Sequence, residues 1–278
     1  SYSYSATADV FYGGMQSEVS DDASALTTSE HVTRVNVSGA DVNNVNYGFS
    51  FNVITNTTDS APTDLNTDAS AWSTFYAGAN GIGVDPDGYY EAVFDGRNEY
   101  IITLCNGSSY HGEVLRYDTH LATNNTAAWT TFDPGANGVG TDPDGYSGGV
   151  FDGRYVYFAP WDNGSGMHGE VLRYDTQGAF NDVAAWDTFD PGANGVGTDP
   201  DGYEGVEFDG RYLYFSPWNN GSGSHSEVLR YDTQADFNTA GSWDTFDFVV
   251  AGVTTREGYD SIEFDGRYMY FEIGRAHV

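Results

Sequence analysis

Short runs of β-branched and aromatic residues, separated by turns rich in Gly and Asp, dominate the chain after residue 70. Residues 154–158, with the sequence RYVYF, are apolar or aromatic on both faces, as in a strand that is covered on both sides. They follow Asp152-Gly153, a dipeptide typical of two-residue hairpin turns. Further strands are predicted at residues 170–174 and 186–189, and no stretch carries a helical signal. The pattern therefore predicts an all-β fold.

The same pattern recurs with a period of 57 residues, which is marked by Trp72, Trp129, Trp186 and Trp243. The copies at 128–176 and 185–233 are nearly identical, whereas the copy at 71–119 has diverged. Four strands in a unit of about fifty residues are typical of a β-propeller blade. We expect three complete blades of four antiparallel strands at 94–132, 151–189 and 208–246, and a half-blade at 259–271. Such an array is an incomplete ring; a solenoid or a row of small β domains is the alternative.

A family resemblance supports the propeller interpretation. The string VLRYDT at 171–176, followed by AWDTFDP at 185–191, resembles the third and fourth strands of a kelch repeat. The resemblance extends over residues 72–271 and implies that the Trp strand is the outermost strand of each blade. One feature departs from the kelch pattern, because Ala159-Pro160-Trp161 stands where kelch repeats carry paired glycines.

The two ends of the chain differ from the repeats. Residues 37–57, VSGADVNNVNYGFSFNVITNT, are similar to the closing strands of small β-sandwich modules in bacterial surface proteins. That resemblance implies an exported, multi-module protein, with a β-sandwich fragment at 1–55 and a Thr- and Asp-rich linker at 56–70. Residues 272–278 resemble the translation of a sequencing adapter. We interpret them as an assembly artefact and expect the natural protein to be longer.

The charge of the chain limits its partners. There are 41 acidic and 10 basic residues, and the net charge is -31. Such a surface repels phosphate backbones, so nucleic acid is excluded as a partner. It favours solubility in salty water and the binding of divalent cations. No apolar run is long enough to predict a membrane span in this fragment. Together with the surface-protein resemblance, these features predict an extracellular or cell-surface location.

One recurrent turn is a candidate calcium site. The motif Asp-Pro-Asp-Gly occurs three times, and hard carboxylate oxygens at this spacing are suitable Ca²⁺ ligands. The alternative is a turn without metal, because Pro presets φ and Gly accepts a positive φ. The candidate metal ligands are Asp85, Asp87, Asp142, Asp144, Asp199 and Asp201.

The Gly-rich loops at 160–168 and 217–225 are the candidate ligand-binding surface. A tryptophan beside Asn and His offers a flat apolar face and directional hydrogen bonds, which together suit sugars. The alternatives are that the Trp rings pack between blades and that the His residues make structural hydrogen bonds. The candidate residues are Trp161, Asn163, His168, Trp218, Asn220 and His225.

No unique catalytic cluster is evident in the sequence. The leading hypothesis is a surface or secreted binding and adhesion module, whose partner is a glycan or another surface protein. One alternative is an extracellular polysaccharide hydrolase or lyase, because propeller enzymes place carboxylates around the central axis. Polar residues of a single blade that depart from the repeat near the axis would indicate such an enzyme. A structural spacer is the third hypothesis.

Overall fold

The computed structural model describes residues 11–12, 15–16, 73–84, 86–254 and 257–273. Contacts divide the chain into two units, Ser1–Ser73 and Thr74–Val278. In the first unit, β1 (Phe11–Tyr12) pairs antiparallel with β2 (Met15–Gln16). The rest of the predicted sandwich fragment at 1–55, the linker at 56–70 and residues 274–278 lie outside the described residues.

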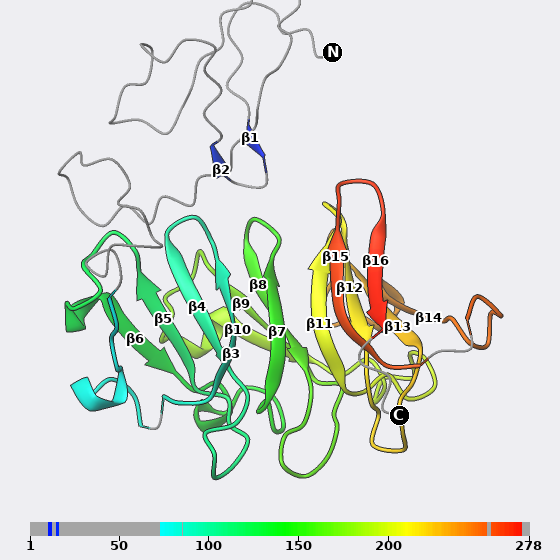
Figure 1. Cartoon of the computed structure of the whole chain (residues 1–278), viewed down its shortest axis with the longest axis horizontal. Coiled ribbons are helices and arrows are strands. Elements are labelled where there is room, and N and C mark those ends of the chain that lie inside the picture. The colour runs from blue at the N-terminus through cyan, green and yellow to red at the C-terminus, as the bar shows by residue number, and fades with distance from the viewer. Residues whose placement is uncertain (1–10, 13–14, 17–72, 85, 255–256, 274–278) are drawn as a thin grey trace, which may run out of the picture. The chain divides into compact units, whose positions relative to one another are not determined.

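The second unit is all-β and is built from consecutive antiparallel sheets (Figure 1). Blade 1 contains β3 (Tyr89–Phe94), β4 (Asn98–Thr103), β5 (Val114–Asp118) and β6 (Trp129–Phe132). Blade 2 contains β7 (Tyr146–Phe151), β8 (Tyr155–Pro160), β9 (Val171–Asp175) and β10 (Trp186–Phe189). Blade 3 contains β11 (Tyr203–Phe208), β12 (Tyr212–Pro217), β13 (Glu227–Asp232) and β14 (Trp243–Asp247). Blade 4 contains β15 (Tyr259–Phe264) and β16 (Met269–Ile273).

The only helical segments in the described part of this unit are single 3₁₀ turns. They precede the outer strands or lie in the loops between blades. Their bounds are η2 Gly78–Asn80, η3 Thr126–Ala128, η4 Gly135–Asn137, η5 Val183–Ala185 and η6 Ala240–Ser242. None of the helices in the described residues has the length and apolar character needed to cross a membrane.

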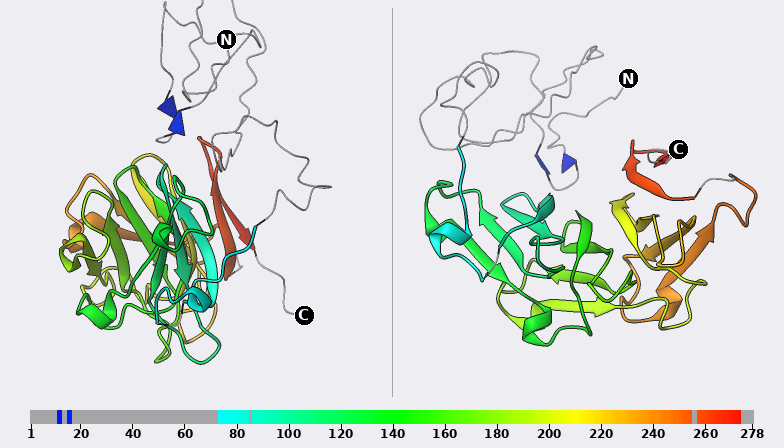
Figure 2. Two further views of the ribbon diagram at one scale, coloured as in Figure 1. Left: turned by 90° about the vertical axis from the view of Figure 1, so that its left-hand side faces the viewer. Right: turned by 60° about the horizontal axis from the view of Figure 1, so that its bottom comes forward.

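The first strands of the blades pack on one another in sequence order. Strand β7 contacts β3 and β11, and β11 also contacts β15. Their order makes them the inner strands of a β-propeller, while the Trp strands β6, β10 and β14 lie at the outer edge of each sheet (Figure 2). The described blades form an incomplete ring, because blade 4 has only two strands. The predicted fold class is confirmed for this unit.

The inner strands start earlier than the sequence pattern indicated. Strand β7 begins at Tyr146, whereas the pattern placed its start near Phe151. The start was not predicted because Ser147, Gly148 and Gly149 have low β propensity. Each inner strand also has a register irregularity after its first residue. Bulges of this kind redirect a side chain, and here they lie at Tyr90, Ser147, Glu204 and Asp260.

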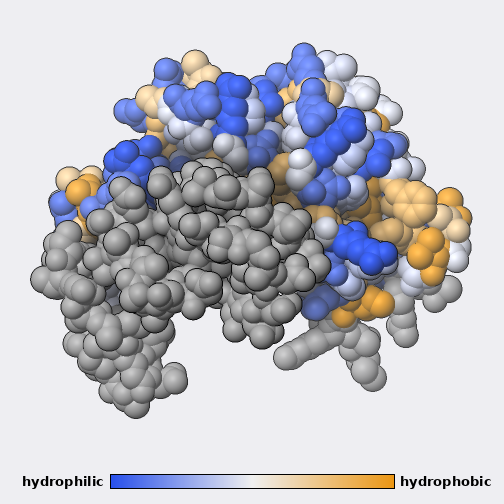
Figure 3. All heavy atoms as spheres, turned by 90° about the horizontal axis from the view of Figure 1, so that it is seen from above, coloured by the Kyte–Doolittle hydropathy of each residue, from blue (hydrophilic) through white to orange (hydrophobic). Residues whose placement is uncertain are grey.

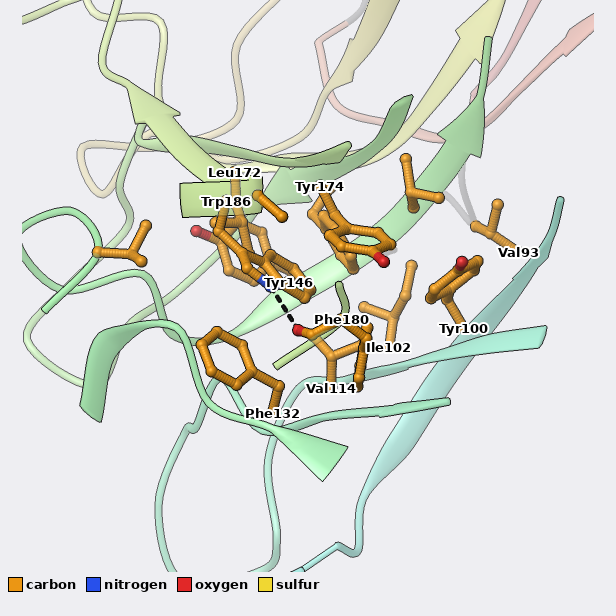
Figure 4. Close-up of a cluster of buried hydrophobic side chains, with 14 residues drawn as sticks. Val93, Tyr100, Ile102, Val114, Phe132, Tyr146, Leu172, Tyr174, Phe180 and Trp186 are labelled. Atoms are coloured by element: carbon orange, nitrogen blue, oxygen red, sulfur yellow. Dashed lines mark hydrogen bonds between the residues drawn. The ribbon is translucent and has the colours of Figure 1, made fainter. Parts of the chain in front are cut away.

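Aromatic residues fill the space between neighbouring blades. Between blades 1 and 2, the ring of Trp186 stacks on Phe132 with centroids 5.4 Å apart and lies 4.6 Å from Tyr174. Its indole N–H donates a 2.8 Å hydrogen bond to the carbonyl of Phe180 (Figure 4). Trp243, Tyr231 and Phe237 repeat this arrangement between blades 2 and 3. Each blade is therefore covered by the next one, as the doubly apolar strands predicted.

The open end of the array leaves apolar residues exposed. Phe246 is 51% exposed, whereas the equivalent Phe132 and Phe189 are buried. Val250 and Val253 are also exposed, on the loop after β14, and Figure 3 shows hydrophobic residues gathered at that end of the molecule. The difference arises because blade 2 covers Phe132 and blade 3 covers Phe189, whereas blade 4 leaves Phe246 largely open.

Candidate functional site

The Asp-Pro-Asp-Gly turns join consecutive blades through their backbone. Gly145 N–H donates to the carbonyl of His111 in blade 1 at 3.2 Å, and Gly202 donates likewise to His168. Gly258, which ends the equivalent segment in blade 4 without the motif, donates to His225. The Gly145 carbonyl then accepts from Trp161 N–H at 3.1 Å. We call this repeated contact the interblade clasp. A Cβ on Gly145 would lie 1.8 Å from the Asp162 carbonyl oxygen, so glycine is required there.

The second carboxylate of the turn packs into the clasp. Gly112 N–H donates to Asp144, and a Cβ on Gly112 would lie 2.8 Å from Asp144 Oδ1. Burial, with the nearby Asp133 and Asp142, raises the pKa of Asp144 to about 6. Burial, with Asp199 and Asp190, raises the pKa of Asp201 to about 6 as well. These carboxylates are therefore part of the contact between blades.

Calcium binding at these turns stays a prediction. Within the described ranges, no group of three or more His, Cys, Asp or Glu side chains is arranged to hold a metal ion. Asp87, Asp142, Asp144, Asp199 and Asp201 lie in the described turns, and Asp85 lies outside the described residues.

The recurring His and Glu residues support the same turns. His111 Nε2 lies 3.1 Å from the carbonyl oxygen of Asp87. His168 is buried with its ring edge against Tyr146, and burial lowers its pKa. Glu170 accepts hydrogen bonds from the backbone N–H groups of Thr141 and Asp142 at 2.9 and 3.1 Å. His225 and Glu227 repeat these positions in blade 3. The predicted structural hydrogen bond is present for His111 only, because the ring nitrogens of His168 and His225 are buried without a hydrogen-bond partner in the described part of the chain.

The two Gly-rich loops bring their tryptophans together. The rings of Trp161 and Trp218 are stacked, with centroids 6.3 Å apart and an interplanar angle of 20°. Both rings are half-buried, and a Cβ on Gly258 in the next blade would lie 3.3 Å from Trp218. The side-chain oxygens of Asn163 and Asn220 accept backbone N–H bonds inside their own loops. The indole faces and the asparagine oxygens of these loops are thus used within the propeller, whereas the buried ring nitrogens of His168 and His225 have no hydrogen-bond partner among the described residues.

Blade 1 departs from the repeat at two positions around Arg116. In blades 2 and 3 the equivalent arginines, Arg173 and Arg230, pair with Asp187 and Asp244 at 3.1 Å. Thr130 takes the place of those aspartates beside Arg116. Arg116 has no ion pair with any residue in the described part of the chain. A cross-strand charge partner is therefore missing only in the first of three equivalent blades.

The second departure removes an aromatic ring. Tyr155 lies between Arg154 and Arg173, with its ring centroid 4.8 and 4.6 Å from the two guanidinium carbons. Asn98 replaces this tyrosine in blade 1, so Arg116 stacks only on Phe180, at 4.5 Å. Arg116 also lines a hollow of about 510 Å³, which we call the Arg116 hollow. Its lining includes Asp95, Asn98, Arg116 and Asp118 of blade 1 and Phe151 and Thr176 of blade 2.

The other charged groups of the Arg116 hollow already have partners within blade 1. Arg97 pairs with Asp118 at 2.7 Å. Asp95 accepts hydrogen bonds from Arg97 N–H, from the backbone and side-chain amides of Asn98, and from the Tyr100 hydroxyl. Arg116 and Asp95 are therefore the two charged groups of the hollow that have no ion pair among the described residues. Asp95 is held by neutral hydrogen-bond donors, and the Arg116 guanidinium contacts the Tyr174 hydroxyl.

The blades also differ from one another on their inner strands, away from Arg116. Tyr90 of blade 1 donates its hydroxyl proton to Glu204 of blade 3. Glu91 accepts a 3.1 Å bond from Gly149 N–H, and a Cβ on Gly148 would lie 2.6 Å from its carboxylate. Burial, opposed by the Tyr90 bond and assisted by Asp260 and Glu91, raises the pKa of Glu204 to about 7. This axial group was not predicted from the sequence, because the pattern did not indicate where each inner strand begins.

Comparisons with known proteins give no family for the chain. No protein-family description matches the sequence, and no curated protein matches it either. The function proposed below therefore depends on the geometry of this molecule. Both departures in blade 1 were visible in the sequence, as Asn98 aligned with Tyr155 and Tyr212, and Thr130 aligned with Asp187 and Asp244.

Proposed function

We propose that this chain is part of an extracellular or cell-surface, kelch-like β-propeller that binds carbohydrate in the Arg116 hollow. The single observation that carries the proposal is the hollow itself, which occurs where Asn98 replaces the tyrosine of the other blades. Its walls combine one half-buried aromatic, Phe151, with amide, carboxylate and guanidinium groups. Sugar sites need this combination of an apolar face and directional polar groups.

The Arg116 hollow is a better candidate than the Trp loops. A hydroxyl-rich ligand can donate to Asp118 and can exchange hydrogen bonds with the Asn98 amide, whereas each oxygen of Asp95 already accepts two hydrogen bonds. In the loops around Trp161 and Trp218, by contrast, the indoles stack on each other and the Asn oxygens are occupied. Binding at these loops would be an accessory contribution.

A glycan array with the full 278-residue chain tests the proposal. The decisive variant is Asn98→Tyr, which fills the hollow with the residue that blades 2, 3 and 4 carry at this position and should therefore fold normally. We expect the wild-type chain to bind saccharides and Asn98→Tyr to lose that binding. A Trp161→Ala variant is the matched comparison and should keep most of it. Binding that survives Asn98→Tyr but is lost in Trp161→Ala would move the site to the loops, and no binding by any chain would contradict carbohydrate recognition.

Calcium stabilisation is a separate part of the proposal. Its support is the recurrence of Asp142 and Asp144 as Asp199 and Asp201, in turns that hold adjacent blades together. Millimolar Ca²⁺ should raise the thermal midpoint of the full chain by several degrees, and a chelator should reverse the rise, because a ligand bound only by the folded state stabilises it. An unchanged midpoint would show that these turns join the blades through backbone hydrogen bonds and do not bind Ca²⁺.

A polysaccharide hydrolase or lyase is the second candidate function. The axial group of Tyr90, Glu91 and Glu204 favours it, because a carboxyl with a pKa of about 7 is suited to donate a proton near neutral pH. Depolymerisation of acidic and neutral polysaccharides should be assayed with the wild-type chain and with Glu204→Gln, which retains the shape and removes the titrating proton. Activity that Glu204→Gln abolishes would support the enzyme, and equal rates in both would rule out this group.

A further inference from the structure

The internal partners of the equivalent arginines indicate which ligand chemistry Arg116 lacks. In blade 2, Arg173 has one aromatic ring on each side, Tyr155 at 4.6 Å and Phe237 at 4.1 Å, and a carboxylate from Asp187 at 3.1 Å. In blade 1, Arg116 keeps one of these three partners, Phe180. A group that restores the missing contacts must carry a carboxylate and a ring that fills the place of Tyr155.

The carboxylates of the hollow define the rest of the ligand. Asp95 and Asp118 are carboxylates, so they repel an anion placed beside them. Asp95 already accepts two hydrogen bonds on each oxygen, whereas Asp118 Oδ2 accepts only from Arg97 and can accept another bond from a hydroxyl. One anionic group directed at Arg116, with a hydroxyl group directed at Asp118, is therefore the complementary distribution. Guanidinium and carboxylate also match in their planar, two-point hydrogen-bonding geometry.

We propose that the Arg116 hollow recognises a uronic-acid residue of a polysaccharide, with the sugar carboxylate paired to Arg116 as Asp187 is paired to Arg173. This inference rests on the proposed carbohydrate-binding function and adds the class of sugar. The sugar ring occupies the volume that the Tyr155 ring fills in blade 2, beside Phe151. Thr130 is the specificity-determining residue, because an aspartate there would satisfy Arg116 internally and remove the need for an external carboxylate.

The molecule supplies its own control for this idea. Thr130 is exposed on β6 opposite Arg116, and aspartate occupies the same position in blades 2 and 3 without disturbing the sheet. Thr130→Asp should therefore fold as the wild type does and form the ion pair seen at Arg173 and Arg230. The side chain introduced by Thr130→Asn has almost the same shape as that introduced by Thr130→Asp but carries no charge. The two variants therefore separate the effect of the charge from that of the side-chain volume.

The test is calorimetric titration of the full chain with trigalacturonate, with neutral galactotriose and with a sulfated galactose trisaccharide. We expect the wild type and Thr130→Asn to bind trigalacturonate with affinities within about twofold of each other. Thr130→Asp should lose about tenfold or more, equivalent to about 1.4 kcal/mol. Galactotriose should bind at least about tenfold more weakly than trigalacturonate in the wild type and should respond little to Thr130→Asp.

The possible failures are distinguishable. Equal affinity for trigalacturonate and galactotriose, or equal affinities of Thr130→Asp and Thr130→Asn, would overturn the uronate assignment while leaving carbohydrate binding intact. Tighter binding of the sulfated trisaccharide would replace the carboxylate by a sulfate and would also overturn it. Binding of none of the three sugars by a chain with a normal cooperative unfolding transition would contradict the proposed function itself.

Discussion

Blades 1 and 2 are built on the same plan but use it differently. Blade 2 follows the repeat closely, its strand-three arginine is enclosed by Tyr155, Phe237 and Asp187, and its Trp186 is buried. Blade 1 keeps the strands and the clasp, yet it loses the tyrosine and the aspartate around Arg116. The residues that recur in every blade thus form the scaffold. Side chains become available for binding where one blade differs from the others.

The largest expected effect concerns the aromatic layer between blades. Trp186→Ala should lower the free energy of unfolding by about 3–5 kcal/mol, because it removes a fully packed ring and leaves a cavity. Trp129→Ala, the equivalent change in blade 1, should cost about 2 kcal/mol, since Trp129 is only half-buried and stacks on Phe75 and Tyr117. Urea unfolding followed by tryptophan fluorescence compares the two. Equal decreases in the free energy of unfolding would mean that Trp129 and Trp186 are packed equally well.

The second effect isolates the interblade clasp. Gly145 and Gly138 both have a positive φ, +65° and +84°, but only Gly145 has a backbone oxygen where its Cβ would lie. Gly138→Ala should therefore cost about 1 kcal/mol for the left-handed backbone alone. Gly145→Ala should cost about 3 kcal/mol, because the turn must also move away from the Asp162 carbonyl, which lies between β8 and β9 of the same blade. Thermal unfolding of both variants measures the difference, and similar midpoints would show that the clasp adds little.

The third effect is a dependence on pH with opposite signs in two regions. The folded pKa of Asp144 and Asp201 is raised to about 6, so the stability of their protonated forms is present below about pH 4 and lost as pH rises through 6. The Asp144→Asn/Asp201→Asn variant should remove that loss. Because both carboxyl groups are partly exposed to solvent, each should account for about 1 kcal/mol of the stability that is lost as pH rises. Arg97 holds the pKa of Asp118 below its usual value, so its contribution disappears only as pH falls through that lowered pKa.

Urea midpoints at pH 4, 5, 6 and 7 test this sign. The ratio of the asparagine variant's stability to that of the wild type should rise with pH over this range. If this ratio did not change with pH, the raised pKa of the two carboxyl groups would be contradicted. If the ratio fell as pH rose, the pKa of these groups would be lowered in the folded state and not raised.

The smallest effect on stability converts blade 2 into blade 1. Tyr155→Asn together with Asp187→Thr should open a second hollow beside Arg173, at a cost of about 1 kcal/mol, because the partly exposed ion pair contributes little and Arg173 keeps Phe237. Titration with trigalacturonate should then show two sites per chain in place of one. A stoichiometry that remains at one in a folded variant would show that the two departures are insufficient to make a site.

The repeat and the strands were predictable because they depend on local pattern. The period of the tryptophans, the hairpin turn at Asp152-Gly153 and the doubly apolar run at 154–158 all indicated blades. The extent of the inner strands was not predictable, since Gly148 and Gly149 carry no strand signal. Their glycines serve a contact across blades, with Glu91, that no local window can show.

The candidate site was harder to predict for a related reason. Repetition drew attention to Trp161 and His168, whose roles depend on neighbours that are distant in sequence, Trp218 and the turn at Asp144. Asn98 and Thr130 were visible as exceptions, but their meaning required the pairing of β4, β5 and β6 around Arg116. The structure brings them together with Phe151 of the next blade, which the sequence alone does not place there.

The most direct test of the central claim is a crystal structure of the full chain with trigalacturonate bound. We expect a sugar ring beside Phe151, in the volume that Tyr155 fills in blade 2, with its carboxylate within hydrogen-bond distance of the Arg116 guanidinium. The same soak of Asn98→Tyr should leave the site without sugar. A sugar bound at the Trp161 and Trp218 loops instead, or a sugar in the hollow of both proteins, would contradict the claim that the departures of blade 1 create the binding site.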